Sequence, residues 1–402
     1  MSGHAAPRHN NMLFTVMVSV VMALGAVVMA IVLLLSGAPG ALAVGALLAV
    51  LPVAPLVFAY LWLDRYEPEP RSLLLLGLGW GAFVATSSAL VFQLIGKYAF
   101  HRPESFSGVV LAPVSEEAAK GLFILLLLWF RRHELDGVLD GIVYAGMVGI
   151  GFAFTENILY LTSAYVGDDT HAGGLGGAIA TFVVRGVFSP FAHPVFTAFT
   201  GIGIGLAVNS RRRIVKIGAP ILGYALAVAA HAAWNGSAFL GGPKTFLQTY
   251  LFLMVPAFIL LFSFSLWSRR QEGVVLTKAL TDCSRRGFLD QREIPWLVGL
   301  AARRQARTYA ASVGGASAKS AMSDYQQYAI ELGFLHHRYL RGVAPRDFAS
   351  RGQYFVDAMN ALRPRLVWPG QGAQVSAGKT IPNQANSDIT ARDGSTHRMD
   401  GQ

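Results

Sequence analysis

The 402-residue sequence is poor in charged residues and has almost no cysteine. Only 14% of its residues are Asp, Glu, Lys or Arg, against about 25% in soluble domains, whereas 53% are hydrophobic. The single cysteine, Cys283, excludes a disulfide within the chain. The 43 glycines follow no period of three, which excludes a collagen-like chain. The scarcity of charge excludes an ordinary soluble domain and indicates a membrane protein.

Long apolar runs fill the chain up to about residue 268. Windows of about 20 residues, the length that crosses a bilayer as a helix, predict eight spans. These spans are 12–35, 41–62, 73–95, 109–130, 138–161, 190–208, 217–239 and 246–267. The apolar stretch 176–188 is short and is expected to form a re-entrant or interfacial helix. The predicted fold is an all-α, polytopic membrane helix bundle of about eight transmembrane helices.

Composition divides the chain into three predicted regions. Residues 1–268 form the membrane domain, 269–368 a basic and partly helical domain, and 369–402 a polar tail expected to be disordered. Lys and Arg outnumber Asp and Glu by 14 to 12 in residues 1–268 and by 19 to 11 in the remainder. A basic region beside a membrane domain is expected to face anionic lipid, and no nucleic-acid-binding signature is present.

The short loops are asymmetric in their positive charge. With the N-terminus inside, the inner segments carry eleven Lys and Arg, from Arg8 to Arg270, and the outer loops carry only Lys97, Arg102 and Lys244. Lys and Arg are enriched on the cytoplasmic side of membrane proteins. Both termini are therefore predicted to be cytoplasmic.

Ionisable and polar side chains inside the predicted spans are functional candidates, because charge in hydrocarbon is costly. There are six candidates: Glu116, Glu117, Glu156, His193, His231 and Asn235. Asn235 lies one helical turn after His231. Lys120 is within reach of both Glu116 and Glu117 on a helix. All of them are expected toward the outer ends of their helices.

Three local features position these candidates. Pro113 fits the first turn of a helix, which would place Glu116 and Glu117 near the positive end of the helix dipole. The small-residue stripe of Gly141, Ala145 and Gly149 is expected to let another helix approach closely. Asp140 is expected to be a helix N-cap.

This set of residues has two chemical interpretations, and the residues alone leave both open. In the first, Glu and His activate a water against a peptide carbonyl while Asn235 stabilises the oxyanion. In the second, Glu156, His193 and His231 supply three ligands for zinc and a second Glu acts as the base.

Other hydrolase signatures are missing. The only His-Glu pair, His133-Glu134, is followed by Gly137 where the HExxH zinc motif needs a histidine. The Gly167-Asp168 pair lacks the preceding glycine of a GxGD aspartyl motif, and the one Gly-x-Ser, at Gly315, lies outside the predicted membrane domain. Three rival mechanisms therefore lose support.

Four motifs in the same order resemble the PrsW family of intramembrane proteases, which is distantly similar to the CAAX prenyl proteases. They are Glu116-Glu117-x-x-Lys120, Phe152-x-x-x-Glu156-Asn157, His193-Pro194 and His231-x-x-x-Asn235. The resemblance covers most of residues 64–267. The CAAX pattern has histidine at the end of its second motif, where this chain has Glu156. Three roles therefore stay open for Glu156: a base, a metal ligand, or a group that supports one of these.

The resemblance implies a bacterial membrane peptidase in which the glutamates and histidines named above are catalytic or activate water. It also implies a single-pass membrane protein as substrate. Anti-sigma factors are the kind of substrate known for the founding member of the family. The expected cut lies near the extracytoplasmic membrane boundary. Two alternatives remain: a proton- or ion-coupled transporter, in which buried Glu and His are equally expected, and a noncatalytic binding protein with the same fold.

Overall fold

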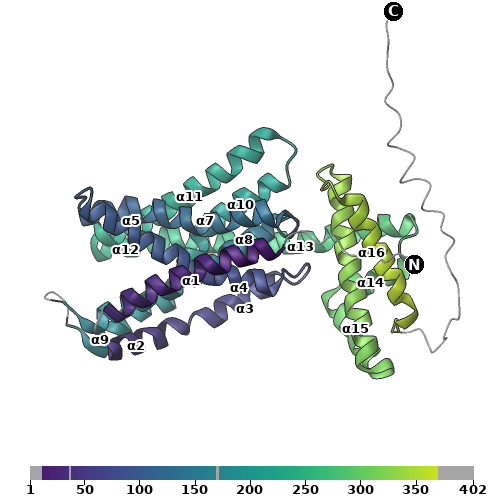
Figure 1. Ribbon diagram of the computed structural model, residues 1–402, viewed down its shortest axis with the longest axis horizontal. Coiled ribbons are helices and arrows are strands. Elements are labelled where there is room, and N and C mark those ends of the chain that lie inside the picture. Colours follow the sequence, from purple (N-terminus) through teal and green to yellow (C-terminus); the bar gives the residue numbers. More distant parts are fainter. Residues whose placement is uncertain (1–10, 36–37, 169–171, 370–402) are drawn as a thin grey trace, which may run out of the picture. The chain divides into compact units, whose positions relative to one another are not determined.

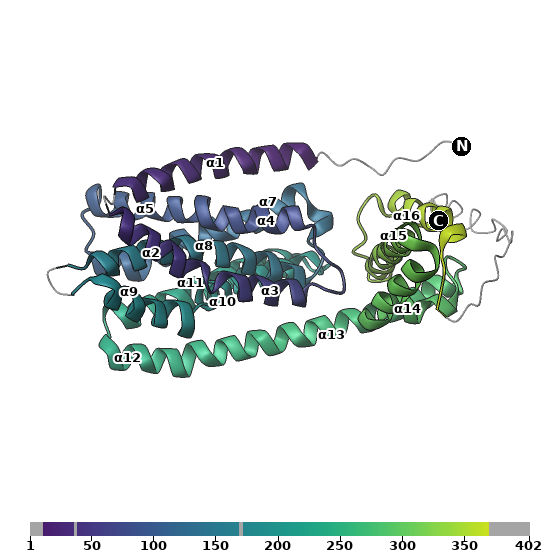
Figure 2. The same ribbon diagram turned by 90° about the horizontal axis from the view of Figure 1, so that it is seen from below.

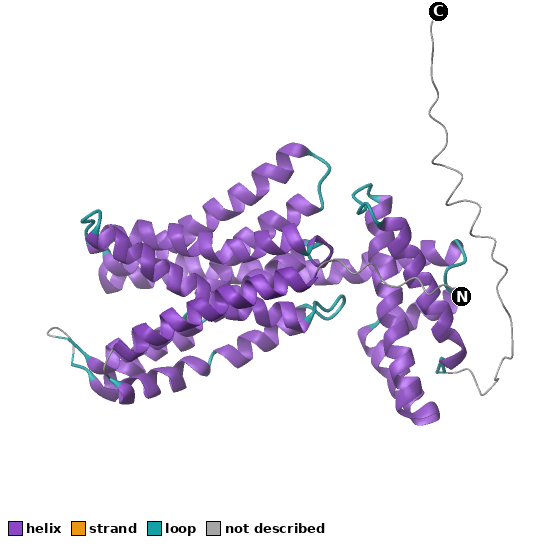
Figure 3. Ribbon diagram, viewed as in Figure 1, coloured by secondary structure: helices purple, strands orange, loops and turns teal. Residues whose placement is uncertain are grey.

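The computed structural model describes residues 11–35, 38–168 and 172–369. Within these ranges every regular element is a helix, which confirms the all-α fold class (Figure 3). The predicted disorder of residues 369–402 falls almost entirely outside the described residues, as does Arg8 of the charge count. The chain separates into two compact units between Arg269 and Arg270, here named the membrane unit and the C-terminal unit.

The membrane unit is a bundle of long helices that run side by side (Figures 1 and 2). Its helices and helical segments are α1 (Asn11–Leu35), α2 (Pro39–Val50), α3 (Val53–Leu63), α4 (Arg71–Gly79), η1 (Trp80–Ala85), α5 (Thr86–Tyr98), α6 (Glu104–Phe106), η2 (Ser107–Leu111), α7 (Ala112–Phe130), η3 (Arg132–Glu134), α8 (Val138–Val166), α9 (Gly174–Phe182), η4 (Val183–Phe188), α10 (Ala192–Val208), α11 (Arg213–Phe239), α12 (Gly242–Thr249), η5 (Tyr250–Met254) and α13 (Val255–Arg285). Segments η1, η2, η4 and η5 are π-helical, and η3 is a 3₁₀ turn.

Seven helical stretches of the described chain are long and apolar enough to cross a membrane. They coincide with seven of the eight predicted spans, with α9, η4 and α10 combined in one stretch of 35 residues. The eighth predicted span is α7, which is 19 residues long and carries three charged residues, Glu116, Glu117 and Lys120. The protein is therefore a multi-pass membrane protein.

Helix α8 lies in the middle of the bundle and packs against α2, α4 and α10. The predicted small-residue stripe is confirmed, because a Cβ at Gly141 would collide with the backbone of Gly201 on α10. A Cβ at Gly149 would lie 2.8 Å from Cα of Pro194 and 3.0 Å from the carbonyl carbon of His193. Glycine at these positions lets α10 lie directly against α8.

Two local predictions were wrong. Segments α6, η2 and α7 form one continuous helical run that begins at Glu104. Pro113 therefore lies inside this run, and Glu116 and Glu117 are more than two turns from its N-terminus. Asp140 is not the N-cap of α8, because Gly137 holds that position. Asp140 lies three residues inside, where its Oδ2 accepts hydrogen bonds from the backbone N–H groups of Asp136 (2.9 Å) and Gly137 (2.6 Å).

The short apolar stretch around 176–188 forms α9 and η4, and it ends at a break over residues 189–191. Backbone at membrane depth needs hydrogen-bond partners, and the break has them. The Ser189 Oγ donates to the Val184 carbonyl at 2.7 Å, and the Tyr250 hydroxyl donates to the Phe188 carbonyl at 3.0 Å. The break places His193 in the first turn of α10.

The C-terminal unit contains the end of α13, η6 (Gln291–Glu293), α14 (Ile294–Val298), α15 (Leu300–Leu340), α16 (Phe348–Leu362) and η7 (Arg363–Arg365). Its own apolar core includes Leu280, Tyr325, Leu335 and Met359. Within α15 the small-residue stretch 312–320 is helical except at Gly315, whose φ of 69° is a conformation that favours glycine.

Candidate active site

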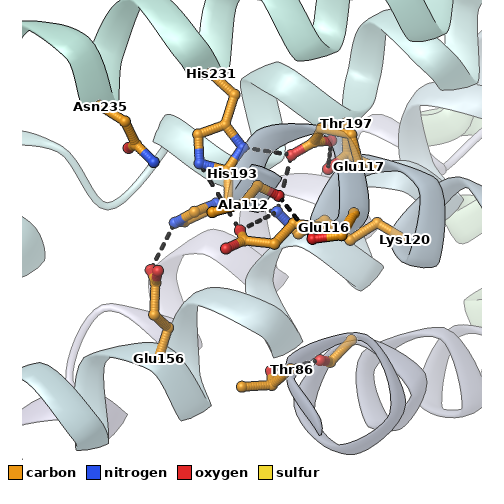
Figure 4. Close-up of polar contacts among 12 residues, drawn as sticks. Thr86, Ala112, Glu116, Glu117, Lys120, Glu156, His193, Thr197, His231 and Asn235 are labelled. Carbon is orange, nitrogen blue, oxygen red and sulfur yellow. Dashed lines mark hydrogen bonds and ion pairs between the residues drawn. The ribbon is translucent and has the colours of Figure 1, made fainter. Parts of the chain in front are cut away.

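Helices α7, α8, α10 and α11 bring the predicted polar residues together inside the membrane unit (Figure 4). Helix α7 supplies Glu116, Glu117 and Lys120, α8 supplies Glu156, α10 supplies His193, and α11 supplies His231 and Asn235. Glu117, Lys120 and His231 are at most 1% exposed. Three carboxylates and the cations Lys120 and Arg185 leave one net negative charge if the two imidazoles are neutral.

Glu117 is the most completely paired carboxylate of the site. Its Oε1 accepts hydrogen bonds from Lys120 Nζ at 2.8 Å and from His231 Nδ1 at 3.0 Å, and its Oε2 accepts one from the Thr197 hydroxyl at 3.0 Å. Both oxygens are thus occupied. Glu117 therefore orients its neighbours and is poorly placed to act as a base.

Lys120 is fully buried and links α7 to α8 and α10. Its Nζ lies 3.1 Å from His193 Nδ1, 3.5 Å from Glu116 Oε2 and 3.7 Å from the centre of the Phe152 ring. An ammonium group only donates hydrogen bonds, so His193 Nδ1 must accept. The proton of a neutral His193 is therefore on Nε2, which faces Glu156 at 2.7 Å.

The opposite tautomer follows for His231. Its Nδ1 faces a carboxylate oxygen of Glu117, so Nδ1 carries the proton and Nε2 keeps its lone pair. The ring stacks on Phe196 with centroids 4.8 Å apart, which further fixes its orientation. The basic nitrogen of His231 points toward Glu116, with 3.8 Å between Nε2 and Oε2.

Glu116 differs from the other two carboxylates because its Oε2 is buried and has no hydrogen-bond partner. The residue is 3% exposed, and its nearest charged neighbour is Lys120 at 3.5 Å. A buried carboxylate oxygen without a hydrogen bond is costly and calls for an additional partner, such as a water or a cation. This oxygen and His231 Nε2 lie 3.8 Å apart, so both could contact one water or one metal ion.

Glu156 is tied to residues on both sides of the break between η4 and α10. Its Oε2 accepts from His193 Nε2 and forms an ion pair with Arg185 of η4. Arg185 also donates to the Asn157 side chain at 2.8 Å and lies over the Tyr160 ring at 3.9 Å. Glu156 thus serves as a support for His193 in this arrangement.

Asn235 lies beside the two histidines in Figure 4. One N–H of its amide donates to the backbone carbonyl of Gly108 in η2 at 2.9 Å. The amide has a second N–H, so the predicted role in stabilising an oxyanion stays open to it. The hydrogen bond to Gly108, a residue outside the four predicted motifs, thus fixes the position of the Asn235 side chain.

One group of His and carboxylate residues in the described chain has the spacing to hold a metal ion. It comprises Glu116, His193 and His231, whose ligand atoms lie within 4.8 Å of one another. The predicted set had Glu156 in place of Glu116, and here Glu156 is occupied by Arg185 and His193. Two imidazoles and one carboxylate, whose Oε2 has no hydrogen bond in the described chain, fit a zinc ion.

Two residues that contact the site had no place in the predicted set. Thr197 follows His193 by four residues, so the helical period gave a signal for it. Arg185 is a single cation in an apolar stretch, which marks it as an intramembrane charge, although sequence gives no sign that its partner is Glu156.

Comparison with known proteins gives results that agree with this geometry. The chain is 28% identical to Protease PrsW of Geobacillus kaustophilus over 163 residues, which are 40% of this chain and 66% of that protein. It is 30% identical to Protease PrsW of Clostridioides difficile over 160 residues, 38% of this chain and 63% of the relative. With Protease PrsW of Shouchella clausii it shares 26% identity over 235 residues, 57% of this chain and 98% of the relative.

The matches to the first two relatives thus span slightly less than two thirds of their length. No solved structure matches the chain. The family described as PrsW family intramembrane metalloprotease matches residues 69–261, a range that includes every residue of the candidate site. On these matches, residues 69–261 of the chain are similar to the PrsW family.

Proposed function

We propose that this protein is an intramembrane peptidase that hydrolyses a peptide bond of a membrane-anchored protein with water activated by Glu116. The observation that carries the proposal is the buried Oε2 of Glu116, which has no hydrogen-bond partner and faces the basic nitrogen of His231. The family match favours a peptidase over the transporter that the buried charges alone would allow.

The proposed reaction uses groups that are already oriented. A water between Glu116 and His231 gives a proton to Oε2 of Glu116 while its oxygen attacks the scissile carbonyl. The free N–H of Asn235 donates to the oxygen that becomes negative. Glu116 then returns the proton to the departing amine. Glu117 and Lys120 hold His231 and His193 in fixed tautomers throughout.

The same residues suit a metal-dependent form of the reaction. Glu116, His193 and His231 would hold zinc, and His193 would release Lys120 to free Nδ1 while its Nε2 stays hydrogen-bonded to Glu156. A zinc ion held there would supply Lewis-acid polarisation of the scissile carbonyl and of the attacking water. Glu117 would orient His231 by accepting the hydrogen bond from its Nδ1, as carboxylates commonly do for metal-binding histidines.

The proposed substrate is a single-pass membrane protein, with an anti-sigma factor as the candidate that the family resemblance suggests. With both termini in the cytoplasm of a bacterial cell, the catalytic residues lie in the outer half of the membrane. His231 is eight residues, about 12 Å, from the outer end of α11, and Glu156 is ten residues, about 15 Å, from that of α8. The cut is therefore expected near the extracytoplasmic boundary of the substrate.

The test is cleavage of candidate single-pass proteins by the purified full chain in liposomes, with and without a zinc chelator. We expect cleavage by the wild type, none by Glu116→Gln, and product ends that map to the outer side by mass spectrometry. Wild-type protein that cleaves no candidate, or equal cleavage by Glu116→Gln, would contradict the proposal. A cut on the cytoplasmic side would overturn the orientation.

A further inference from the structure

Arg185 and His193 approach one carboxylate oxygen from opposite sides of a helix break. Arg185 belongs to η4, which ends at Phe188, and His193 lies in the first turn of α10. Both contact Oε2 of Glu156 on α8, with 2.7 Å between His193 Nε2 and that oxygen. Glu156 therefore connects the two sides of the break.

The contacts of Arg185 go beyond a single ion pair. Its guanidinium also donates to Asn157 Oδ1 and lies over the Tyr160 ring. Together with the ion pair to Glu156, these contacts join Arg185 to a single stretch of α8. The Arg185 side chain is 22% exposed and that of Glu156 is 15% exposed. A planar, multiply donating guanidinium fixes a partly buried carboxylate in one orientation, which an ammonium group does less well.

The orientation of Glu156 matters because the other nitrogen of His193 faces the centre of the site. The His193 ring lies between Glu156 on one side and Lys120 and His231 on the other, with 5.2 Å between the two imidazole centroids. A carboxylate free to rotate away from Nε2 would leave the ring held only by Lys120 and the aromatic contacts.

We propose that Arg185 is a positioning residue that holds the Glu156 carboxylate against His193 and thereby fixes the imidazole in the reaction centre. The inference rests on the proposed function for its kinetic consequences. Arg185 itself contacts none of Glu116, His193 and His231 in the structure's hydrogen bonds and ion pairs among the described residues.

The experiment compares Arg185→Gln, Arg185→Lys, Glu156→Gln and the double variant Arg185→Gln/Glu156→Gln, each as the full chain in liposomes. The matched control is Lys97→Gln, which removes a cation from an exposed ion pair with Glu104. Two quantities are measured: kcat and KM for the substrate that the wild type cleaves, and the affinity for zinc alone by competition with a chelator.

We expect Arg185→Gln to lower kcat and zinc affinity by about 10-fold each, with KM within about two-fold, as for residues that support a ligand from behind. Arg185→Lys should recover most of the loss. In the Glu156→Gln background, Arg185→Gln should cause no further fall in kcat, because it acts through Glu156. Lys97→Gln should match the wild type.

Losses of Arg185→Gln and Glu156→Gln that multiply in the double variant would overturn the inference, as would a lower melting temperature with unchanged kcat and zinc affinity. Should Arg185→Gln fail to fold, Arg185→Lys and the charge-neutral double variant decide the question. Wild-type protein that binds zinc but cleaves nothing would contradict only the proposed function, since the zinc affinities still test Arg185. Wild-type protein that does neither would overturn both.

Discussion

Each unit of the protein buries a carboxylate next to a cation, Glu116 in the membrane unit and Glu293 in the C-terminal unit. Glu293 uses both oxygens: Oε1 accepts from Arg363 at 2.7 Å, and Oε2 accepts from the Tyr325 hydroxyl. Glu116 leaves Oε2 without a hydrogen bond, although it is equally buried. A buried carboxylate whose two oxygens both accept hydrogen bonds stabilises a fold. One with an oxygen that accepts no hydrogen bond can still bind a ligand or a proton.

The largest expected effect separates these two glutamates directly. Glu116→Gln should lower kcat by about 10³-fold with little change in melting temperature, because the amide cannot accept a proton from water. Glu293→Gln should destabilise the C-terminal unit by about 1–3 kcal/mol and leave kcat within about two-fold. Peptide cleavage and thermal unfolding of both variants check this. Loss of activity in Glu293→Gln with normal folding would break the comparison.

Glu117 is a fully paired carboxylate inside the candidate site, so it sharpens the distinction. Glu117→Gln should reduce kcat about 30-fold and should also destabilise the membrane unit by about 3 kcal/mol, since Lys120 loses its closest counter-charge. Thr197→Val, which removes only the hydrogen bond to Oε2, is the milder variant and should cost kcat about three-fold. Thermal unfolding in detergent and steady-state kinetics measure both. Undiminished stability in Glu117→Gln would argue against a supporting role.

Backbone approach at Gly149 tests whether the site depends on packing as well as on charge. Gly149→Ala would push the backbone of His193 and Pro194 away from α8 and should lower kcat about 10-fold. Gly218→Ala on α11 is the matched control, because a Cβ there meets no atom within 4 Å, and it should be neutral. Equal kinetics for the two variants would show that the spacing of α8 and α10 has no bearing on the site.

Another buried carboxylate, Asp64, lies between α3 and α4 and accepts a hydrogen bond from the backbone N–H of Glu69 at 2.9 Å. Burial raises the pKa of Asp64 from 3.8 to about 8, and the charge of Asp140 adds to the shift. Because the folded-state pKa is raised, the stabilising contribution is complete below about pH 4 and is lost as the pH rises through about 8. The melting temperature should therefore fall between pH 5 and pH 9, and Asp64→Asn should remove roughly half of that fall. An identical pH dependence in Asp64→Asn would contradict this.

Removal of residues 370–402 has the smallest expected effect. The segment is polar and has few large apolar residues, so it has little to bury against either unit. Activity should stay within about three-fold of the full chain, measured on the same substrate. Abolished cleavage with normal membrane insertion would assign the segment a function.

Much of the helical architecture could be predicted from the sequence, because long apolar runs and small-residue stripes are local signals. The approach of Gly141 and Gly149 to α10 follows from such a stripe. The start of the helix before α7 could not be predicted in the same way, since Pro113 resembles a first-turn proline although a π-helical segment precedes it.

The candidate site was predicted in its residue types but not in its pairing. Glu156 and Glu116 are both intramembrane glutamates, and sequence spacing does not show which one Arg185 neutralises. Their roles depend on contacts between residues that are distant in sequence, such as Arg185 with Glu156 and Thr197 with Glu117. Such contacts arise only when the helices pack.

The π-helical segment η2 also sets the rotational register of the helix that carries Glu116. A π turn holds one more residue than an α turn, and each residue of an α-helix turns the chain by about 100°. If the same residues formed a regular α-helix instead, the extra residue would rotate the outer part of the run by that angle. Gly108 would then face away from Asn235, and the amide would lose its anchor although every catalytic side chain was still present.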